Sequence, residues 1–350
     1  MSDTSEPLER DELPWLKDPN IKISIWAIIK DSIGKDISKL TVPVYMNDAS
    51  SLLQKCGSSM EYIDILDKAC AEKEQAMRLA IVSVFGCSMT TSAERSCSKP
   101  FNPLLGETFE LTTDEFEFLS EQVSHHPPVC ANYARGRKSN YIYWNNTKTN
   151  TKFNGKGMDL YHQYRTYVDL PDYKERYEIQ TPSMSLHNLI VGTMYLDIGG
   201  TLKSKILDQP NLACQIRFQK KGWISREEYK CEGEVYETQP EKGKKGRMLY
   251  KIHGRWSSDI FITAFMPDQY AINGKLDEST TQCFFSKNPY PEKWAYMYGM
   301  SHFSLQLNYF PSWLQKTVAP TDSRRRPDQR ALENGDMILA AKEKDRLENK

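Results

Sequence analysis

The chain has 350 residues, with 46 basic and 46 acidic side chains and a formal net charge of zero. This length permits one large β-rich unit or two modest ones. A general nucleic-acid binder needs a basic surplus to displace counterions, so the charge balance argues against that class of protein. Apolar residues at 39% are typical of a folded chain, and aromatic residues at 11% favour β structure.

The spacing of the cysteines and the composition of the N-terminus indicate where in the cell the protein is expected. No two of the eight cysteines are separated by two residues, so a zinc ribbon or a thioredoxin motif is not indicated. The acidic N-terminus, MSDTSEPLERDELPW, does not resemble a secretory signal, and the longest apolar stretches are too short to cross a bilayer. We therefore expect a cytoplasmic protein with reduced thiols, needing no metal and no cofactor.

The first 40 residues are predicted to form an arm followed by one short helix. Residues 1–20 are acidic, contain three prolines and show no hydrophobic period, which predicts a flexible arm. A helix is expected to begin after Ser24 and to end at Gly34. Its apolar stripe predicts either a helix packed on the core or a mobile lid, with the candidate lid residues being Ile25, Trp26, Ile28, Ile29 and Ile33.

The middle of the chain changes from helical to strand-like patterns. Residues 60–85 predict helices, and the segment Met77–Phe85 is apolar on almost every side, which indicates burial. From about Phe109 to Phe265, short strand-like runs recur with turn signals between them, which indicates a curled or closed antiparallel sheet. The clearest runs are Tyr141–Trp144, Leu189–Leu196, Leu212–Phe218, Lys230–Glu237 and Arg247–Trp256.

After Tyr290 the pattern becomes irregular and then helical. The segment Thr321–Arg330 is strongly charged, and Asp336 is the expected N-cap of a last helix reaching Asn349. Lys344 and Glu348 fall on the otherwise apolar face of that helix. The simplest interpretation is that Lys344 reaches solvent at the edge of the face and pairs with Glu348 four residues later.

The string EQVSHHPP at residues 121–128 is the most informative in the chain. The prolines stiffen the segment and favour an extended backbone before them. Because adjacent side chains diverge in an extended strand, one metal ion shared by His125 and His126 is disfavoured. Two neighbouring imidazoles can instead donate to different oxygens of one phosphate group. For an isolated histidine pair, the commoner outcome is a structural role with one ring buried and the other exposed.

A second string, KPFNPLLGE at residues 99–107, predicts a rigid loop because it holds two prolines and a glycine. Lys99 supplies a positive charge and Asn102 an amide donor, which together suit a phosphate group. The string is not a P-loop, since the signature GK[ST] is missing. We find no nucleophile elbow, no cysteine beside a convincing base and no metalloprotease motif.

These strings, together with LHNLIVG at residues 186–192 and PTDSRRRPDQR at residues 320–330, resemble the signatures of the oxysterol-binding protein-related family of lipid-transfer proteins. They occur in the family's order and span roughly residues 24–350. The family pattern carries an arginine one helical turn after Glu348, and this sequence ends at Lys350 before reaching it. We see neither a pleckstrin-homology domain nor a motif for docking to the endoplasmic reticulum.

The resemblance implies an α+β fold: a large incomplete antiparallel β-barrel around a hydrophobic tunnel, with flanking helices and an N-terminal helical lid. We accordingly divide a single domain into an arm and lid (1–40), a helical region (41–108), a barrel (109–290) and a C-terminal helical region (291–350). The resemblance further implies that the head group of a phosphoinositide is held by Lys99, Asn102, His125, His126, Lys344 and Glu348.

The function implied is lipid transfer without covalent chemistry. Such proteins carry a sterol in the tunnel, and many exchange it for phosphatidylinositol 4-phosphate while touching membrane surfaces transiently, for example at membrane contact sites. Two alternatives remain: a lipid-regulated sensor or scaffold, and a carrier of another lipid such as phosphatidylserine. A hydrolase using His125 or His126 as base is disfavoured, because no nucleophile or metal-site motif accompanies the pair.

Overall fold

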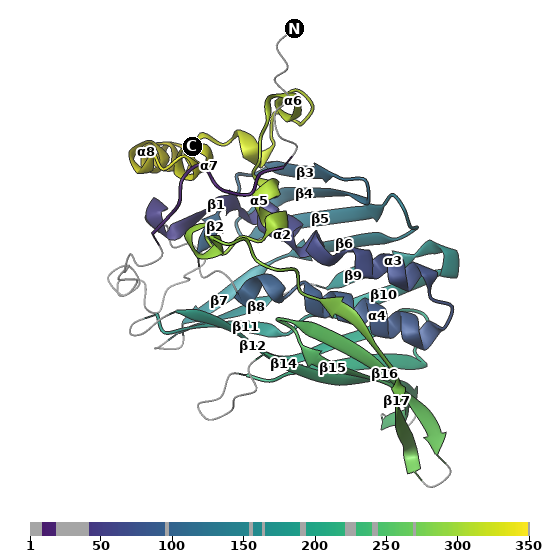
Figure 1. Cartoon of the computed structure of the whole chain (residues 1–350). Helices are drawn as coiled ribbons and strands as arrows, with labels where there is room; N and C mark the ends of the chain where they lie inside the picture. Colours follow the sequence, from purple (N-terminus) through teal and green to yellow (C-terminus); the bar gives the residue numbers. More distant parts are fainter. Residues whose placement is uncertain are drawn as a thin grey trace.

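The computed structural model describes residues 9–18, 42–94, 98–153, 157–162, 165–189, 194–220, 229–239, 244–268 and 271–348. One curved antiparallel sheet dominates this part of the chain (Figure 1). Its fifteen strands are β3 (Thr108–Thr112), β4 (Phe116–His125), β5 (Pro128–Gly136), β6 (Ile142–Thr147), β7 (Thr149–Phe153), β8 (Met158–His162), β9 (Thr166–Leu170), β10 (Glu175–Gln180), β11 (Ser183–His187), β12 (Tyr195–Ile206), β13 (Leu212–Phe218), β14 (Lys230–Gln239), β15 (Lys244–Arg255), β16 (Asp259–Asp268) and β17 (Ala271–Ser286).

The sheet is an incomplete barrel. Its strands run in the order β17-β16-β15-β14-β13-β12-β10-β9-β6-β5-β4-β3, and the remaining three extend it sideways, with β11 paired to β12 and β8, and β7 paired to β8. The edge strands β3 and β17 lie at opposite ends of this order, so the sheet does not close on itself. The expected barrel of antiparallel strands is therefore confirmed.

Period-two alternation gives the sheet one buried and one exposed face. On β15, within the predicted run Arg247–Trp256, Tyr250 and Ile252 are buried whereas Lys251 and His253 face outward. The predicted run Leu212–Phe218 coincides with β13. The run expected over Leu189–Leu196 is wrong in its start: of its described residues, Leu189 and Met194 lie outside any strand, and β12 begins at Tyr195.

The buried face also carries a row of polar residues across four strands. Ser120, Asn132, Asn145 and Thr166 stand opposite one another in register on β4, β5, β6 and β9. The Ser120 hydroxyl donates to Asn132 Oδ1 at 2.6 Å, and Asn132 Nδ2 donates to Asn145 Oδ1 at 2.7 Å. Because each buried polar group finds its partner on the neighbouring strand, a register slip would leave these groups unpaired.

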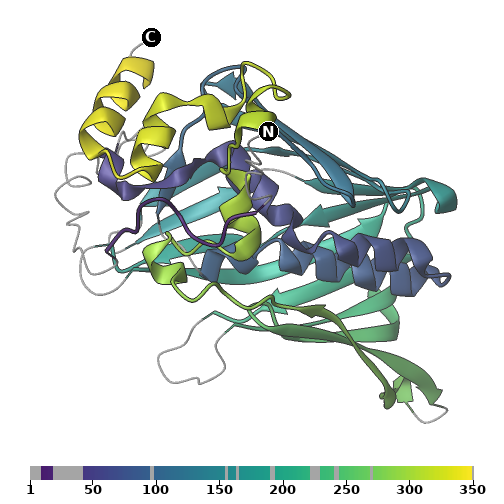
Figure 2. The ribbon, with the colours of Figure 1, turned by 45° about the horizontal axis from the view of Figure 1, so that its top comes forward.

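Helices cover the inner side of the sheet. They are α2 (Leu52–Ser58), α3 (Asp64–Ala71) and α4 (Gln75–Ser88), with short 3-10 turns η3 (Val44–Met46), η4 (Ser59–Tyr62) and η5 (Thr91–Glu94) beside them. Helix α4 is buried on almost every side, as its composition predicts, and packs against β10 and β12–β15 (Figure 2). Helix α2 lies in the expected helical region 41–108, ahead of the pattern seen over residues 60–85; Ser51 and Gln54 form its capping box.

The C-terminal region contains short helices and one longer one. After the 3-10 turn η8 (Trp294–Tyr296) come α5 (His302–Leu307), α6 (Ser312–Gln315), the turn η9 (Ser323–Arg325), α7 (Pro327–Glu333) and α8 (Met337–Glu348). Asp336 caps α8, since its carboxylate accepts the Leu339 amide at 2.9 Å. Figures 1 and 2 show α6, α7 and α8 at the top of the molecule and β14–β17 at the bottom.

The predicted flexible arm is wrong for residues 9–18, which pack onto the C-terminal region. Leu13 is 4% exposed and joins a cluster with Met297 and Leu305. Arg10 pairs with Glu333 at 2.6 Å. Proline content and acidity suggested flexibility, but local composition does not reveal partners that lie nearly three hundred residues away in the sequence.

Two predictions concern residues outside the described part. The candidate lid residues Ile25, Trp26, Ile28, Ile29 and Ile33 all fall there, as do three residues of the LHNLIVG string. Among the described residues, no helix is long and apolar enough to span a membrane.

Candidate functional site

Lys99 is held at the start of a short strand beside the main sheet. Strand β2 (Lys99–Phe101) pairs in parallel with β1 (Asn47–Ser51), and the Asn47 side-chain amide donates to the Lys99 carbonyl at 3.0 Å. The side chain is half-buried. Burial lowers the pKa of Lys99, the nearby charge of Lys344 lowers it further, and Glu348 raises it. Lys99 thus shares one environment with two residues of the last helix.

Lys344 reaches inward from α8, although the simplest interpretation placed it at a solvent edge. It is 5% exposed, and its ammonium group pairs with Glu348 at 2.9 Å. The predicted pairing is therefore present, but Lys344 is buried and only Glu348 reaches the surface. The Glu348 carboxylate pairs with Lys344, and its charge also raises the pKa of the half-buried Lys99.

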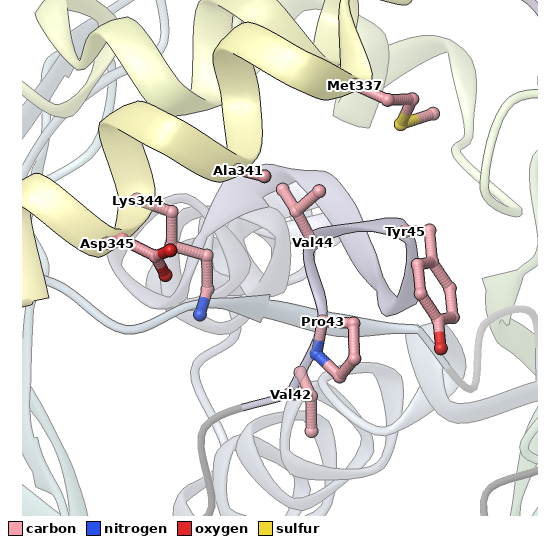
Figure 3. Close-up of a pocket in the computed structure, with 8 residues that line it drawn as sticks. All are labelled: Val42, Pro43, Val44, Tyr45, Met337, Ala341, Lys344 and Asp345. Atoms are coloured by element: carbon pink, nitrogen blue, oxygen red, sulfur yellow. The ribbon is translucent and has the colours of Figure 1, made fainter.

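A cavity of about 480 Å³ lies beside Lys344 (Figure 3). The chain segment leading into η3 forms one wall and α8 the other. Its lining is mainly apolar and comprises Val42, Pro43, Val44, Tyr45, Met337, Ala341, Lys344 and Asp345. Figure 3 shows the Lys344 nitrogen extending from α8 towards Val42 and Pro43. The cavity therefore combines a mainly apolar lining with one cation, Lys344, and one acid, Asp345.

Arg326 fixes the loop that carries Asn102. Its guanidinium donates to the Asn102 carbonyl at 2.7 Å and forms ion pairs with Glu107 at 3.0 Å and Asp328 at 2.6 Å. All three charged side chains are buried. The Asn102 side chain itself is exposed. The buried Arg326 therefore fixes the backbone of the proline-rich loop, while the side-chain amide of Asn102 lies at the surface.

The two histidines lie on the tight turn between β4 and β5. Their rings approach edge to face, with centroids 4.7 Å apart, so they do not diverge as an extended backbone predicted. The peptide bond between His126 and Pro127 is cis. His125 is half-buried and His126 exposed, and the buried Nδ1 of His125 has no hydrogen-bond partner within the described protein. The two imidazole rings therefore lie side by side at the end of β4 and on the turn that follows it.

The loop and the histidine turn are connected through the backbone. The Gly106 amide donates to the Gln122 carbonyl at 2.9 Å, and the Gln122 amide donates to the Glu107 carbonyl at 2.9 Å. These bonds join the end of the KPFNPLLGE string to β4, three residues before His125. The segment that carries Lys99 and the segment that carries the two histidines are therefore joined by backbone hydrogen bonds.

The six head-group candidates fall into three sets. Lys99, Lys344 and Glu348 share one charged environment, and His125 and His126 share the β4–β5 turn, with Asn102 on the loop between them. Sequence reasoning missed the role of Arg326. The alternation of arginine and aspartate in the PTDSRRRPDQR string was a usable signal, because buried arginines need nearby carboxylates.

The chain is similar to known proteins over most of its length. The oxysterol-binding protein family profile matches residues 24–350. The chain is 32% identical to mouse oxysterol-binding protein-related protein 3 over 97% of its own length and 38% of that protein, and 30% identical to human oxysterol-binding protein-related protein 2 over 93% and 74%. The chain therefore spans well under half of the first of these relatives.

Solved structures show the same fold. The Osh1 ORD domain in complex with ergosterol superposes with a TM-score of 0.86 at 30% identity, covering 98% of this chain and 82% of that one. The Osh3 ORD of Saccharomyces cerevisiae in complex with PI(4)P gives 0.83 at 26% identity, covering 97% and 86%. With the profile match across nearly the whole sequence, these findings show that the chain belongs to the oxysterol-binding protein family.

Proposed function

We propose that this protein extracts a sterol from one membrane, carries it in the barrel interior and exchanges it for phosphatidylinositol 4-phosphate. The observation that carries the proposal is the approach of two lysines, the half-buried Lys99 and the buried Lys344, which lie close enough that the charge of Lys344 lowers the pKa of Lys99. Related domains have been solved with ergosterol, with cholesterol and with PI(4)P. Lipid binding by this family supports transfer; the exchange partner and direction are our proposal.

The phosphoinositide head group suits the cationic end of the site. Two ammonium groups in one buried environment repel each other, and a phosphate group offsets that repulsion through charge-assisted hydrogen bonds. His125 and His126 would donate to further oxygens of the same group. A multiply charged head group without such partners would meet a large desolvation penalty.

The lipid tail or sterol needs an apolar wall, and one begins next to the cavity. Leu189 is buried among partly buried apolar side chains, which include Met46 of η3 and residues of β7, β8 and β11, namely Phe153, Met158 and Leu186. A sterol exposes several hundred Å² of apolar surface, which corresponds to on the order of 10 kcal/mol in water at about 25 cal/mol per Å². Enclosing the lipid removes most of this barrier to transfer.

A lid over the barrel mouth completes the proposal. Residues Ile25, Trp26, Ile28, Ile29 and Ile33 would cover the bound lipid with their apolar stripe and release it on contact with a bilayer. Contact with membranes would thus be transient and peripheral, and no covalent step is required.

The test is extraction of phosphatidylinositol 4-phosphate from liposomes by the double variant His125→Ala with His126→Ala. We expect extraction to be lost while sterol extraction and the thermal unfolding midpoint stay near those of the parent. His126 is exposed and His125 is half-buried at the end of β4, so we expect the fold to tolerate the loss of both rings. Unchanged phosphoinositide extraction would refute the head-group assignment.

A further inference from the structure

Two cysteines meet on the inner side of the sheet, and the proposed function uses neither of them. Cys56 lies on α2 and is half-buried, whereas Cys130 lies on β5 and is fully buried. Thr147 of β6 stands directly opposite Cys130, and its hydroxyl oxygen lies 3.8 Å from the Cys56 sulfur. The two thiols also form a hydrogen bond with each other. A helix and a strand that are far apart in the sequence therefore bring two thiols into contact.

Hydrogen-bond donors surround the Cys56 sulfur. The Thr147 oxygen accepts the side-chain amide of Asn132 at 3.0 Å, so the hydroxyl hydrogen of Thr147 is available for the Cys56 sulfur. The hydrogen bond from Cys130 lowers the pKa of Cys56, burial opposes it, and Thr147 and Asn132 lower the pKa further. Because the thiolate is the nucleophilic form of cysteine, this environment makes Cys56 the more reactive member of the pair.

Cys130 is held as a protonated thiol. Its sulfur donates to Gln122 Oε1 at 2.9 Å, and Gln122 stands directly opposite it on β4. The hydrogen bond with Cys56 and burial both raise the pKa of Cys130. A partly accessible sulfur that favours the thiolate thus touches a buried thiol that keeps its proton. This is the arrangement of an attacking cysteine beside a resolving cysteine.

Cys70 lies in the opposite environment and provides a matched control. It is half-buried like Cys56 and lies on the next helix, α3. Burial raises the pKa of Cys70 to about 12, with the charges of Asp67 and Asp172 adding to it. Its sulfur lies 3.8 Å from the Asn140 carbonyl, which accepts the thiol hydrogen. Partial exposure alone therefore does not make a cysteine of this chain reactive.

We propose that Cys56 and Cys130 form a dithiol site that reduces an organic hydroperoxide and is itself converted to a disulfide. The Cys56 thiolate attacks the terminal oxygen of the hydroperoxide, so that an S–O bond forms and the O–O bond breaks. The departing alkoxide takes a proton from solvent and becomes an alcohol. Cys130 then attacks the sulfur of the Cys56 sulfenic acid, an S–S bond forms, and hydroxide leaves with the Cys130 proton as water. Two thiols are oxidised and one hydroperoxide is reduced.

The surroundings of Cys56 favour an uncharged and partly apolar oxidant. Cys56 and Leu52, one helical turn before it on α2, pack as partly buried side chains against the apolar core. A charged oxidant would lose its hydration there, which an organic hydroperoxide does not. Thr147 and Asn132 supply donors for the negative charge that develops on the departing oxygen. The class of substrate is therefore a hydroperoxide carried on an apolar molecule.

The test uses the reduced, lipid-free protein and cumene hydroperoxide, with peptides mapped by mass spectrometry before any reduction. We expect a fast phase that consumes one hydroperoxide per chain and leaves a Cys56–Cys130 cross-link lacking two hydrogen atoms. In Cys130→Ala the reaction should stop at a sulfenic acid on Cys56, which dimedone traps. In Cys56→Ala the fast phase should slow at least about tenfold, whereas Cys70→Ala should match the parent within about twofold.

A measurement on the parent protein keeps the proposal testable even if a variant fails to fold. Alkylation by iodoacetamide is followed peptide by peptide at several pH values, and Cys56 should become reactive at a lower pH than Cys70. A parent that forms no cross-link between Cys56 and Cys130, a sulfenic acid that appears on Cys70 instead, or identical pH profiles for Cys56 and Cys70 would overturn the proposal. No lipid enters these measurements, so the dithiol site and the lipid exchange can fail independently.

Discussion

Lys99 on strand β2 and Lys344 on helix α8 are far apart in the sequence but lie close enough that the charge of Lys344 lowers the pKa of Lys99. Burial acts on Lys99 in the same direction, and Glu348 opposes it. Glu348 pairs with Lys344 at 2.9 Å, and its charge also raises the pKa of Lys99. The arrangement is better suited to receiving an anion than to stabilising the empty protein.

The lowered pKa of Lys99 predicts how the empty protein responds to pH. In the unfolded chain this lysine keeps its ordinary pKa of 10.5, so between the lowered value and 10.5 the unfolded state binds more protons. The free energy of unfolding should therefore rise as pH rises through this window. Urea denaturation of the parent and of Lys99→Met, compared at several pH values, isolates the contribution.

Phosphoinositide binding should respond to the same titration with the opposite sign, because loss of the Lys99 proton removes a cation from the site. A parent and Lys99→Met pair whose difference in unfolding free energy is independent of pH, or falls with rising pH, would contradict the assigned environment.

Lys344→Met separates binding from stability. We expect phosphatidylinositol 4-phosphate affinity to fall about 10- to 100-fold, since a charge-assisted hydrogen bond contributes about 1.5–3 kcal/mol. The unfolding free energy of the lipid-free protein should fall little or rise, because an apolar side chain replaces a buried cation that repels Lys99. Liposome extraction and urea denaturation measure the two effects. A large loss of stability with unchanged affinity would assign Lys344 a structural role instead.

In contrast to Lys99 and Lys344, Arg326 is expected to contribute to stability and not to lipid binding. Arg326→Met leaves Glu107 and Asp328 buried without their partner, and breaking a buried pair costs about 3–5 kcal/mol. The matched control is Arg346→Met, because Arg346 pairs with Glu343 on the surface of α8, where such pairs contribute about 0–1 kcal/mol. Denaturation midpoints compare them. Equal small losses in both variants would show that the loop is not held by Arg326.

The packing of residues 9–18 makes a prediction for stability. Leu13→Ala should destabilise the protein by about 2 kcal/mol or more, since a buried leucine leaves a cavity when truncated. Leu105→Ala serves as control, because Leu105 is 67% exposed, and a change within about 0.5 kcal/mol is expected there. If Leu13→Ala were as mild as its control, residues 9–18 would not belong to the folded core.

The same packing changes how a lid should be tested. Deleting residues 1–33 would remove Leu13 and Arg10 along with the candidate lid and would confuse retention with stability. Replacing Ile25 and Trp26 by serine leaves this packing intact. We expect normal extraction of sterol but faster loss of bound sterol to acceptor liposomes. Retention equal to that of the parent would remove the lid from the proposal.

Local patterns predicted most of the strands because alternation and turn residues are local signals. Strand β13, the outward face of β15 and the capping of α8 by Asp336 all follow from a few neighbouring residues. The packing of Leu13 does not, because its partners are distant in sequence and nothing near it indicates them.

The candidate site was predictable only in part for the same reason. Single strings reveal a rigid loop and a histidine pair, and the resemblance to a family adds Lys344 and Glu348. The approach of Lys99 to Lys344 and the clamp formed by Arg326 depend on tertiary contacts between β2, the 102–107 loop, α7 and α8. The edge-to-face histidine rings likewise depend on the turn geometry, which an extended backbone did not predict.

Competition between two lipids for one interior tests the central claim most directly. Sterol-loaded protein is mixed with liposomes containing phosphatidylinositol 4-phosphate, and the complexes are weighed by native mass spectrometry. The account predicts one lipid per chain throughout, with the mass of the sterol lost as the mass of the phosphoinositide is gained. A chain carrying both lipids together, or one that keeps its sterol and never acquires the phosphoinositide, would contradict it.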